Sequence, residues 1–282
     1  MNPAYLVAAL ASTLYGSADF AGGVAARRAP AMLVTMFSGF AALAVLLVGM
    51  TFLHGAPRPA DLGWGTAAGI AGAAGATLIY YSLARGPVSV ASPIFCVVGL
   101  SVPVLIGFAL GERPSAWAWS GVGLAAVAIP PLSWADDARG IYTPAHVRGT
   151  VAIAVLTGLV VGWFLVFLAR IGPHAGLLPL VLARVVAMVA LLAAILARRL
   201  PARLPAGARG VASLAGALDS TANLTYYLAV QHAPMALVAT LVSLAPATTV
   251  LLARITLGER WNAPQRWGLA MALAAGALIS RG

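Results

Sequence analysis

A carboxylate, an amide and two phenols recur at helical spacing late in the chain. Asn223, Tyr226 and Tyr227 follow Asp219 at steps of four, seven and eight, so a helix would place all of them near one face. Together these groups suit a polar, partly cationic ligand such as an ammonium group. A structural interpretation is equally open, in which Asp219 forms a buried ion pair with Arg184 and the tyrosines pack.

A second polar stripe opens the chain. Ser12, Tyr15, Gly16 and Asp19 are three or four residues apart, which again places them on one helical face. The stripe either lines a cavity or contacts another helix through its glycine. Trp163 leaves a similar choice, because its ring could close a cavity or belong to the packing.

The elements that must hold these groups are apolar. The chain has 282 residues, of which 61% are hydrophobic and 9% are charged, whereas soluble domains carry about 25% charged residues. Several uncharged stretches, such as those from Arg28 to Arg58 and from Arg113 to Asp136, exceed the ~20 residues that a helix needs to cross a bilayer. They show no period-2 alternation, which favours helices over a barrel. The sequence therefore predicts an all-α membrane protein.

Ten transmembrane helices are expected. The predicted spans are 4–25, 31–53, 62–84, 89–110, 115–134, 148–170, 174–197, 207–230, 234–257 and 264–280. The only long connection, 135–147, divides the chain into a first five-helix unit, 1–134, and a second, 148–282.

The two units resemble each other in sequence. Tyr80-Tyr81 is matched by Tyr226-Tyr227, and Gly111-Glu112-Arg113 recurs 147 positions later as Gly258-Glu259-Arg260. Each Gly-Glu-Arg tripeptide taken alone is typical of a helix end. Because five crossings are an odd number, the second copy must insert upside down. Inverted repeats of this kind are usual in secondary transporters, whose substrate site lies between the halves near the midplane.

These residues resemble the EamA-type ten-helix members of the drug/metabolite transporter superfamily. The resemblance covers essentially the whole chain and is carried by the paired tyrosines, the two Gly-Glu-Arg helix ends and the opening segment Leu14-Tyr15-Gly16-Ser17-Ala18-Asp19-Phe20. It implies a bundle around a central cavity lined by helices 1, 3, 4, 6, 8 and 9. It also implies transport, often outward, of amino acids, nucleobases, sugars or drug-like metabolites.

The expected function is that of a secondary transporter, an exporter of small polar or amphipathic metabolites such as amino acids, working by alternating access. The expected setting is the cytoplasmic (inner) membrane of a bacterium, with the chain as a monomer or homodimer contacting membrane lipid and a small-molecule substrate. A lipid or polyprenyl-carrier flippase is the alternative, and an intramembrane lipid-modifying enzyme a more remote one. No enzymatic activity, cofactor or metal is expected, because the four histidines form no ligand-spaced pair.

The net charge of +10 could suit nucleic acid. All 17 basic residues are arginine, however, and most sit in short segments between apolar runs, where they set topology, so no nucleic-acid partner is expected. They are concentrated in the odd-numbered connections, which this rule places inside, with the termini outside. The family resemblance implies cytoplasmic termini instead, and the orientation stays open.

The candidate binding residues combine the polar stripes with aromatic and hydroxyl groups from the repeated helices. Arg184 is expected to have a structural or coupling role, and Cys96, the single cysteine, to pack as a small hydrophobe. The predicted substrate-binding residues are Tyr15, Asp19, Tyr81, Trp163, Asp219, Asn223, Tyr227 and Ser243.

Overall fold

The computed structural model describes residues 2–85, 88–132, 144–200, 203–257, 263–279 and 281. Over these residues the secondary structure is helical, and most of the predicted connection 135–147 lies outside them. The helices are α1 (Pro3–Ala26), α2 (Ala31–Met50), α3 (Pro59–Arg85), α4 (Val88–Ala109), α5 (Ala116–Leu132), α6 (Pro144–Ala169), η1 (Pro173–Ala175), α7 (Leu178–Ala197), α8 (Ala206–Val230), α9 (Met235–Val242), α10 (Pro246–Leu257) and α11 (Ala263–Ile279).

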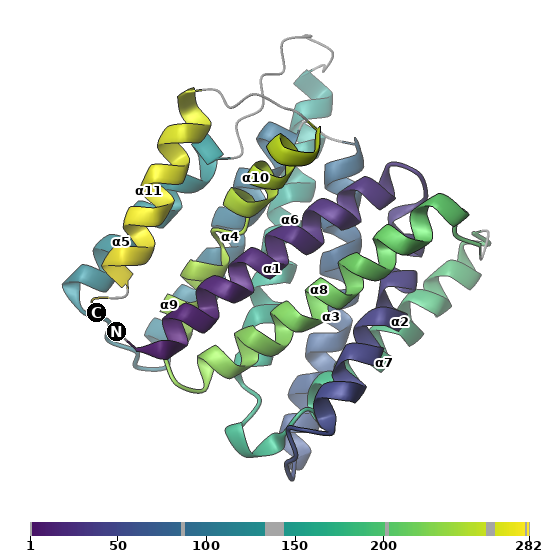
Figure 1. Cartoon of the computed structure of the whole chain (residues 1–282), viewed down its shortest axis with the longest axis horizontal. Helices are drawn as coiled ribbons and strands as arrows, with labels where there is room; N and C mark the ends of the chain where they lie inside the picture. The colour runs from purple at the N-terminus through teal and green to yellow at the C-terminus, as the bar shows by residue number, and fades with distance from the viewer. Residues whose placement is uncertain are drawn as a thin grey trace.

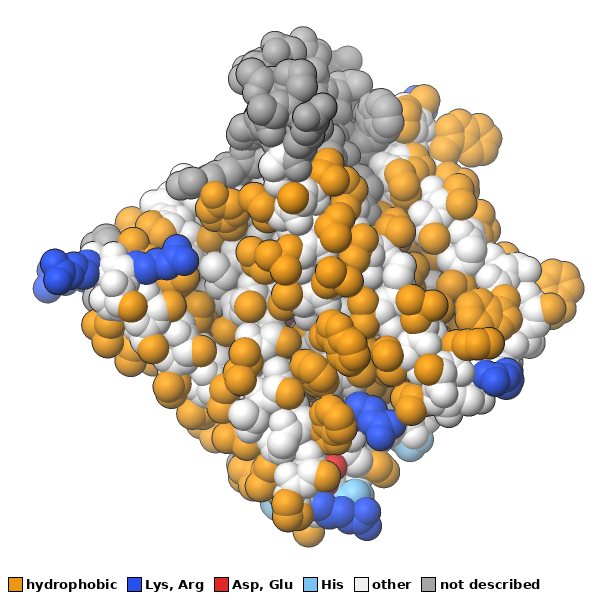
Figure 2. Space-filling view, turned by 180° about the vertical axis from the view of Figure 1, so that it is seen from behind, with side chains coloured by type: hydrophobic (Ala, Val, Ile, Leu, Met, Phe, Trp, Pro, Cys, Tyr) orange, Lys and Arg blue, Asp and Glu red, His pale blue; other side chains and the backbone are white. Residues whose placement is uncertain are grey.

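Long apolar helices occur in both halves of the chain. Within the described residues, four segments are long and apolar enough to cross a bilayer: Ala31–Met50, Pro59–Ser82, Gly149–Ala169 and Leu178–Ala197. Figure 2 shows hydrophobic side chains spread over the middle of one face and arginines toward its margins. Such a surface suits contact with hydrocarbon in the middle and with headgroups at the edges.

The ends of the helices define two faces of the molecule. On one, here called the terminus face, the side-chain amide of Asn2 donates to the carbonyl of His232 (3.0 Å), and the N–H of Ala56 donates to the carbonyl of His174 (2.9 Å). On the other, the arginine face, Arg28 Nη1 donates to the carbonyl of Gly207 (3.0 Å).

Small residues set how closely the helices approach. A Cβ on Gly216 of α8 would overlap the backbone of Ser38 in α2, and a Cβ on Gly16 of α1 would overlap the carbonyl of Ala245. α1 and α2 therefore pack directly against α8, while α3 packs on α6 and α7. α5 and α11 lie together at one edge of the bundle (Figure 1).

The predicted ninth span, 234–257, is not one helix. It is divided into α9 and α10 by residues 243–245. Pro246 has no N–H to donate, and the N–H of Leu244 turns to the carbonyl of Leu241 (3.2 Å) instead of that of Thr240. The break thus leaves the carbonyls of Thr240 and Ser243 without their usual backbone donors.

The first Gly-Glu-Arg segment does more than end a helix. The carboxylate of Glu112 accepts hydrogen bonds from the N–H groups of Met235 (2.7 Å) and Ala236 (3.0 Å). These are donors that the first turn of α9 cannot satisfy internally, and a negative charge there is favoured by the helix dipole. Glu112 therefore fastens the α4–α5 turn of the first half to a helix of the second.

Candidate functional site

A cavity of about 440 Å³ lies between the two halves of the chain. Its wall is formed mainly by α1, α3 and α4 from the first half and by α6, α7, α8 and the α9–α10 break from the second, with isolated residues from α2, α10 and α11. The lining residue Gly69 lets α3 approach α7 closely, because a Cβ there would overlap the backbone of Ala183. The volume lies in the usual range of small-molecule sites, about 300–1,000 Å³.

The cavity has one closed end and one open end. Toward the terminus face it ends on Leu46, Leu168 and Leu180, all buried in the largest hydrophobic cluster. At the other end the wall includes Arg27, which is exposed, and Gln265 at the start of α11. The cavity therefore reaches the surface at the arginine face.

A chain of hydrogen bonds crosses the middle of the wall. The hydroxyl of Tyr15 donates to Asn223 Oδ1 (2.6 Å), and Asn223 Nδ2 donates to Asp219 Oδ2 (3.1 Å). Arg184 Nη2 donates to the same carboxylate oxygen at 2.6 Å. The ion pair between Arg184 and Asp219 is therefore present, and it forms part of the cavity wall rather than a sealed core.

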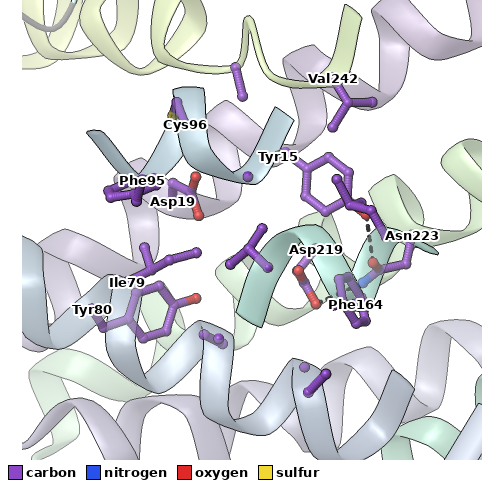
Figure 3. Close-up of a pocket in the computed structure, with 18 of the residues that line it drawn as sticks. Tyr15, Asp19, Ile79, Tyr80, Phe95, Cys96, Phe164, Asp219, Asn223 and Val242 are labelled. Carbon is purple, nitrogen blue, oxygen red and sulfur yellow. Dashed lines mark hydrogen bonds between the residues drawn. The ribbon is translucent and has the colours of Figure 1, made fainter. Parts of the chain in front are cut away.

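Asp19 lies in the same wall, one helical turn beyond Tyr15. Unlike Asp219, its carboxylate makes no hydrogen bond or ion pair with any residue that the structure describes. The oxygens of Asp19, Tyr80 and Asp219 border the same space in Figure 3. The charged side chains of the wall are Asp19, Asp219, Arg184 and, at the open end, Arg27. Because Asp219 is paired with Arg184, the carboxylate of Asp19 is the group suited to a ligand that carries positive charge.

The rest of the wall is largely apolar. Phe20, Ile79, Phe95 and Phe164 contribute side chains to it from four different helices. Burial of apolar surface contributes roughly 25 cal/mol per Å². A ligand with an apolar body and a charged end would therefore use both parts of the wall.

Six of the nine residues predicted for the site line this cavity. They come from α1, α7, α8 and the α9–α10 break, and the structure brings them together although they are far apart in sequence. They are Tyr15, Asp19, Arg184, Asp219, Asn223 and Ser243.

The other three predicted residues do not line the cavity. Tyr81 is 37% exposed on the outside of α3, and Trp163 is 43% exposed, with its ring beside Phe167 at a centroid distance of 5.6 Å. Tyr227 is buried, and its hydroxyl donates to the carbonyl of Gly172 (2.9 Å). Each of these side chains lies on a side of its helix other than the one that lines the cavity.

Tyr80 is the principal lining residue that the sequence reasoning missed. It is buried in the cavity wall, and a Cβ on Gly22 of α1 would overlap its ring. It lies eight residues after Gly72, on the same helical face, but the sequence does not indicate which face of α3 meets the cavity. Cys96 and Thr249 also line the cavity. Among the described residues no group of three or more His, Cys, Asp or Glu could hold a metal ion.

A cavity between two halves of an apolar helical chain is typical of membrane transporters. The model of the EamA-like transporter family matches residues 2–132 and 148–281. The chain belongs to the EamA-like transporter family, and it is a multi-pass membrane transporter of the drug/metabolite type.

The fold is also found among solved structures. One, titled only "Crystal structure of protein", has a TM-score of 0.76 and 19% identity, covering 98% of this chain and 95% of that one. No curated protein matches the chain.

Proposed function

We propose that the protein is a secondary transporter that exports small amphipathic metabolites with a cationic group, zwitterionic amino acids among them, by alternating access. The observation that carries this proposal is the carboxylate of Asp19, which faces the cavity without a described partner. A carboxylate held in a membrane interior is costly unless a cation, a proton or water accompanies it.

The neighbouring ion pair supports recognition of a zwitterion. Arg184 uses Nη2 to bind Asp219, and no other hydrogen bond joins its guanidinium to the described residues. A guanidinium offers five N–H donors in a fork that matches a carboxylate. A substrate could therefore place its ammonium group near Asp19 and its carboxylate near Arg184, with its apolar part against Phe164.

The architecture behind this proposal is a pair of inverted five-helix repeats, with boundaries at 1–134 and 148–282. α3 and α8 occupy equivalent places in the two repeats, and Gly172 contacts both. Its N–H donates to Asp61 at the start of α3 (2.9 Å), and its carbonyl accepts from Tyr227 near the end of α8 (2.9 Å). The two helices therefore run in opposite directions, as inverted copies would.

The direction of transport follows from which end of the cavity is open. The open end lies at the arginine face, beside Arg27 and Arg28. Arginine-rich connections are retained on the cytoplasmic side. We therefore place this face in the bacterial cytoplasm, so that the cavity would load from inside and release outside.

The test is a flux measurement on purified protein in sealed liposomes. Radiolabelled amino acids, nucleosides and lipophilic cations are screened singly, with and without a pH gradient. Accumulation of a zwitterionic or cationic solute above that of protein-free liposomes supports the proposal. Movement of labelled lipid alone indicates a flippase, and chemical conversion of a lipid without solute flux indicates an enzyme; either result would contradict it.

A further inference from the structure

The two tyrosine pairs of the chain stand in equivalent positions of the sequence. Tyr226 and Tyr227 follow Tyr80 and Tyr81 by 146 positions. In the second half the Tyr226 hydroxyl donates to the carbonyl of Leu165 (3.1 Å), and that of Tyr227 donates to the carbonyl of Gly172 (2.9 Å). Both rings are buried.

These two hydroxyls join helices on either side of the closed end of the cavity. α8 packs with α1 and α2, whereas α6 packs with α3 and α4. The tyrosines of α8 reach across to the main chain of α6 and of the turn after it, and Gln231 Nε2 adds a bond to the carbonyl of Ile171 (3.0 Å). Leu46, Leu168 and Leu180 lie buried beside this seam. The tyrosine pair of α8 therefore holds the terminus face shut.

The pair in α3 lies at the opposite, open end. Tyr80 borders the cavity, its hydroxyl directed into it (Figure 3), and makes no hydrogen bond with a described residue. Its ring rests on Gly22 of α1, one turn beyond Asp19. Tyr81 is 37% exposed on α3. Among the described residues, Tyr80 therefore makes no hydrogen bond equivalent to the one by which Tyr226 closes the terminus face.

We infer that Tyr80 is the gate of the arginine face, and that it closes when its hydroxyl binds a main-chain carbonyl in the last turns of α1. Moving the acceptor of Tyr226, the carbonyl of Leu165, back by the same 146 positions places it at Asp19. The inference rests on the proposed alternating access between inverted repeats. In the closed state Tyr80 would cover the carboxylate of Asp19, so that closing the gate encloses the group proposed to bind substrate.

Cys96 provides a reporter for the open end, because it is the only cysteine and it lines the cavity. Its reaction rate with a membrane-impermeant maleimide, added from the arginine face of oriented vesicles, measures how often that end is open. Leu46→Cys in a Cys96→Ser background reports the terminus face in the same way, since Leu46 is buried at the closed end. Neither measurement requires a substrate.

Replacing Tyr226 or Tyr227 by phenylalanine removes one bond that closes the terminus face. Each change is expected to slow labelling of Cys96 by about two- to tenfold and to speed labelling of Leu46→Cys by a similar factor. Tyr80→Phe removes the hydroxyl proposed to close the arginine face. It should therefore disfavour the state in which the terminus face is open, and slow labelling of Leu46→Cys from that face. Because Tyr226→Phe and Tyr227→Phe are made separately, either one can be used if the other fails to fold.

The matched control is Tyr5→Phe, which removes a hydroxyl on α1 that bonds to no described residue. It should change neither labelling rate. Opposite shifts for Tyr80→Phe and the α8 variants support the gate; shifts in the same direction, or none, overturn it. Because solute flux is measured separately, a failed gate with intact flux would leave the proposed function standing. Opposite shifts without flux would support the gate and contradict the transport proposal.

Discussion

Arg184 and Asp219 form an ion pair in the cavity wall, with Arg184 Nη2 2.6 Å from Asp219 Oδ2. Their side chains are 16% and 31% exposed, so the pair is neither sealed nor fully solvated. Asn223 donates to the same oxygen, which links the pair to Tyr15. The arrangement combines a structural bond with a charged surface that a solute can reach.

The first prediction concerns this pair. Asp219→Asn should abolish transport while leaving the protein inserted, because it removes the anion that orients Arg184. It should lower the free energy of unfolding by about 1–3 kcal/mol, toward the lower figure because the pair is partly exposed. Chemical denaturation in detergent measures this cost.

A double-mutant cycle provides the control. Adding Arg184→Gln to Asp219→Asn removes the stranded charge, so the double variant should be destabilised by less than the sum of the single changes. Additive effects on the free energy of unfolding would contradict the ion pair. Wild-type flux in Asp219→Asn would remove the pair from the transport mechanism.

The second prediction concerns the contact between α8 and α2. Gly216→Ala should destabilise the protein by about 1–3 kcal/mol, because the new Cβ would overlap the backbone of Ser38. Gly210→Ala on the same helix meets no atom within 4 Å. It should be neutral or stabilising by up to about 1 kcal/mol. The two melting temperatures are compared in one detergent, and equal changes would contradict the close packing.

The third prediction concerns the hydrogen bonds between Glu112 and the first turn of α9. Glu112→Ala removes both acceptors from the first turn of α9 and should lower the free energy of unfolding by about 1–3 kcal/mol. Glu112→Gln keeps one acceptor oxygen and should lose roughly half as much. If alanine and glutamine cost the same, the carboxylate is not satisfying two N–H groups.

Much of the fold could be predicted from the sequence because its main signals are long. In a membrane, the backbone of an uncharged stretch of more than 20 residues can satisfy its hydrogen bonds only as a helix, and the spans containing α2 and α6 follow from that alone. The stripe from Asp219 to Asn223 was also readable, since residues four apart share a helix face.

Two features could not be predicted: where a helix breaks, and which of Tyr80 and Tyr81 faces the cavity. Pro103 lies inside the continuous helix α4, whereas Pro246 begins α10 after a break, so a proline alone does not locate an interruption. Tyr80 and Tyr81 differ by one position, about 100° around a helix. Which of them meets the cavity depends on how α3 packs on its neighbours, and that is set by the whole bundle.

The central claim is that Asp19 binds the transported solute. Because its carboxylate has no described partner, Asp19→Asn should leave the melting temperature unchanged. Ser17→Ala, two residues away, removes only a hydroxyl that bonds to the carbonyl of Thr13 (2.8 Å) within α1 and serves as the control.

The most direct measurement is the initial rate of solute flux in liposomes that contain equal amounts of folded wild-type, Asp19→Asn or Ser17→Ala protein. We expect Asp19→Asn to lose at least about tenfold of the wild-type rate, the effect of removing a charged hydrogen-bond partner, and Ser17→Ala to keep it. A wild-type rate in Asp19→Asn would contradict the account.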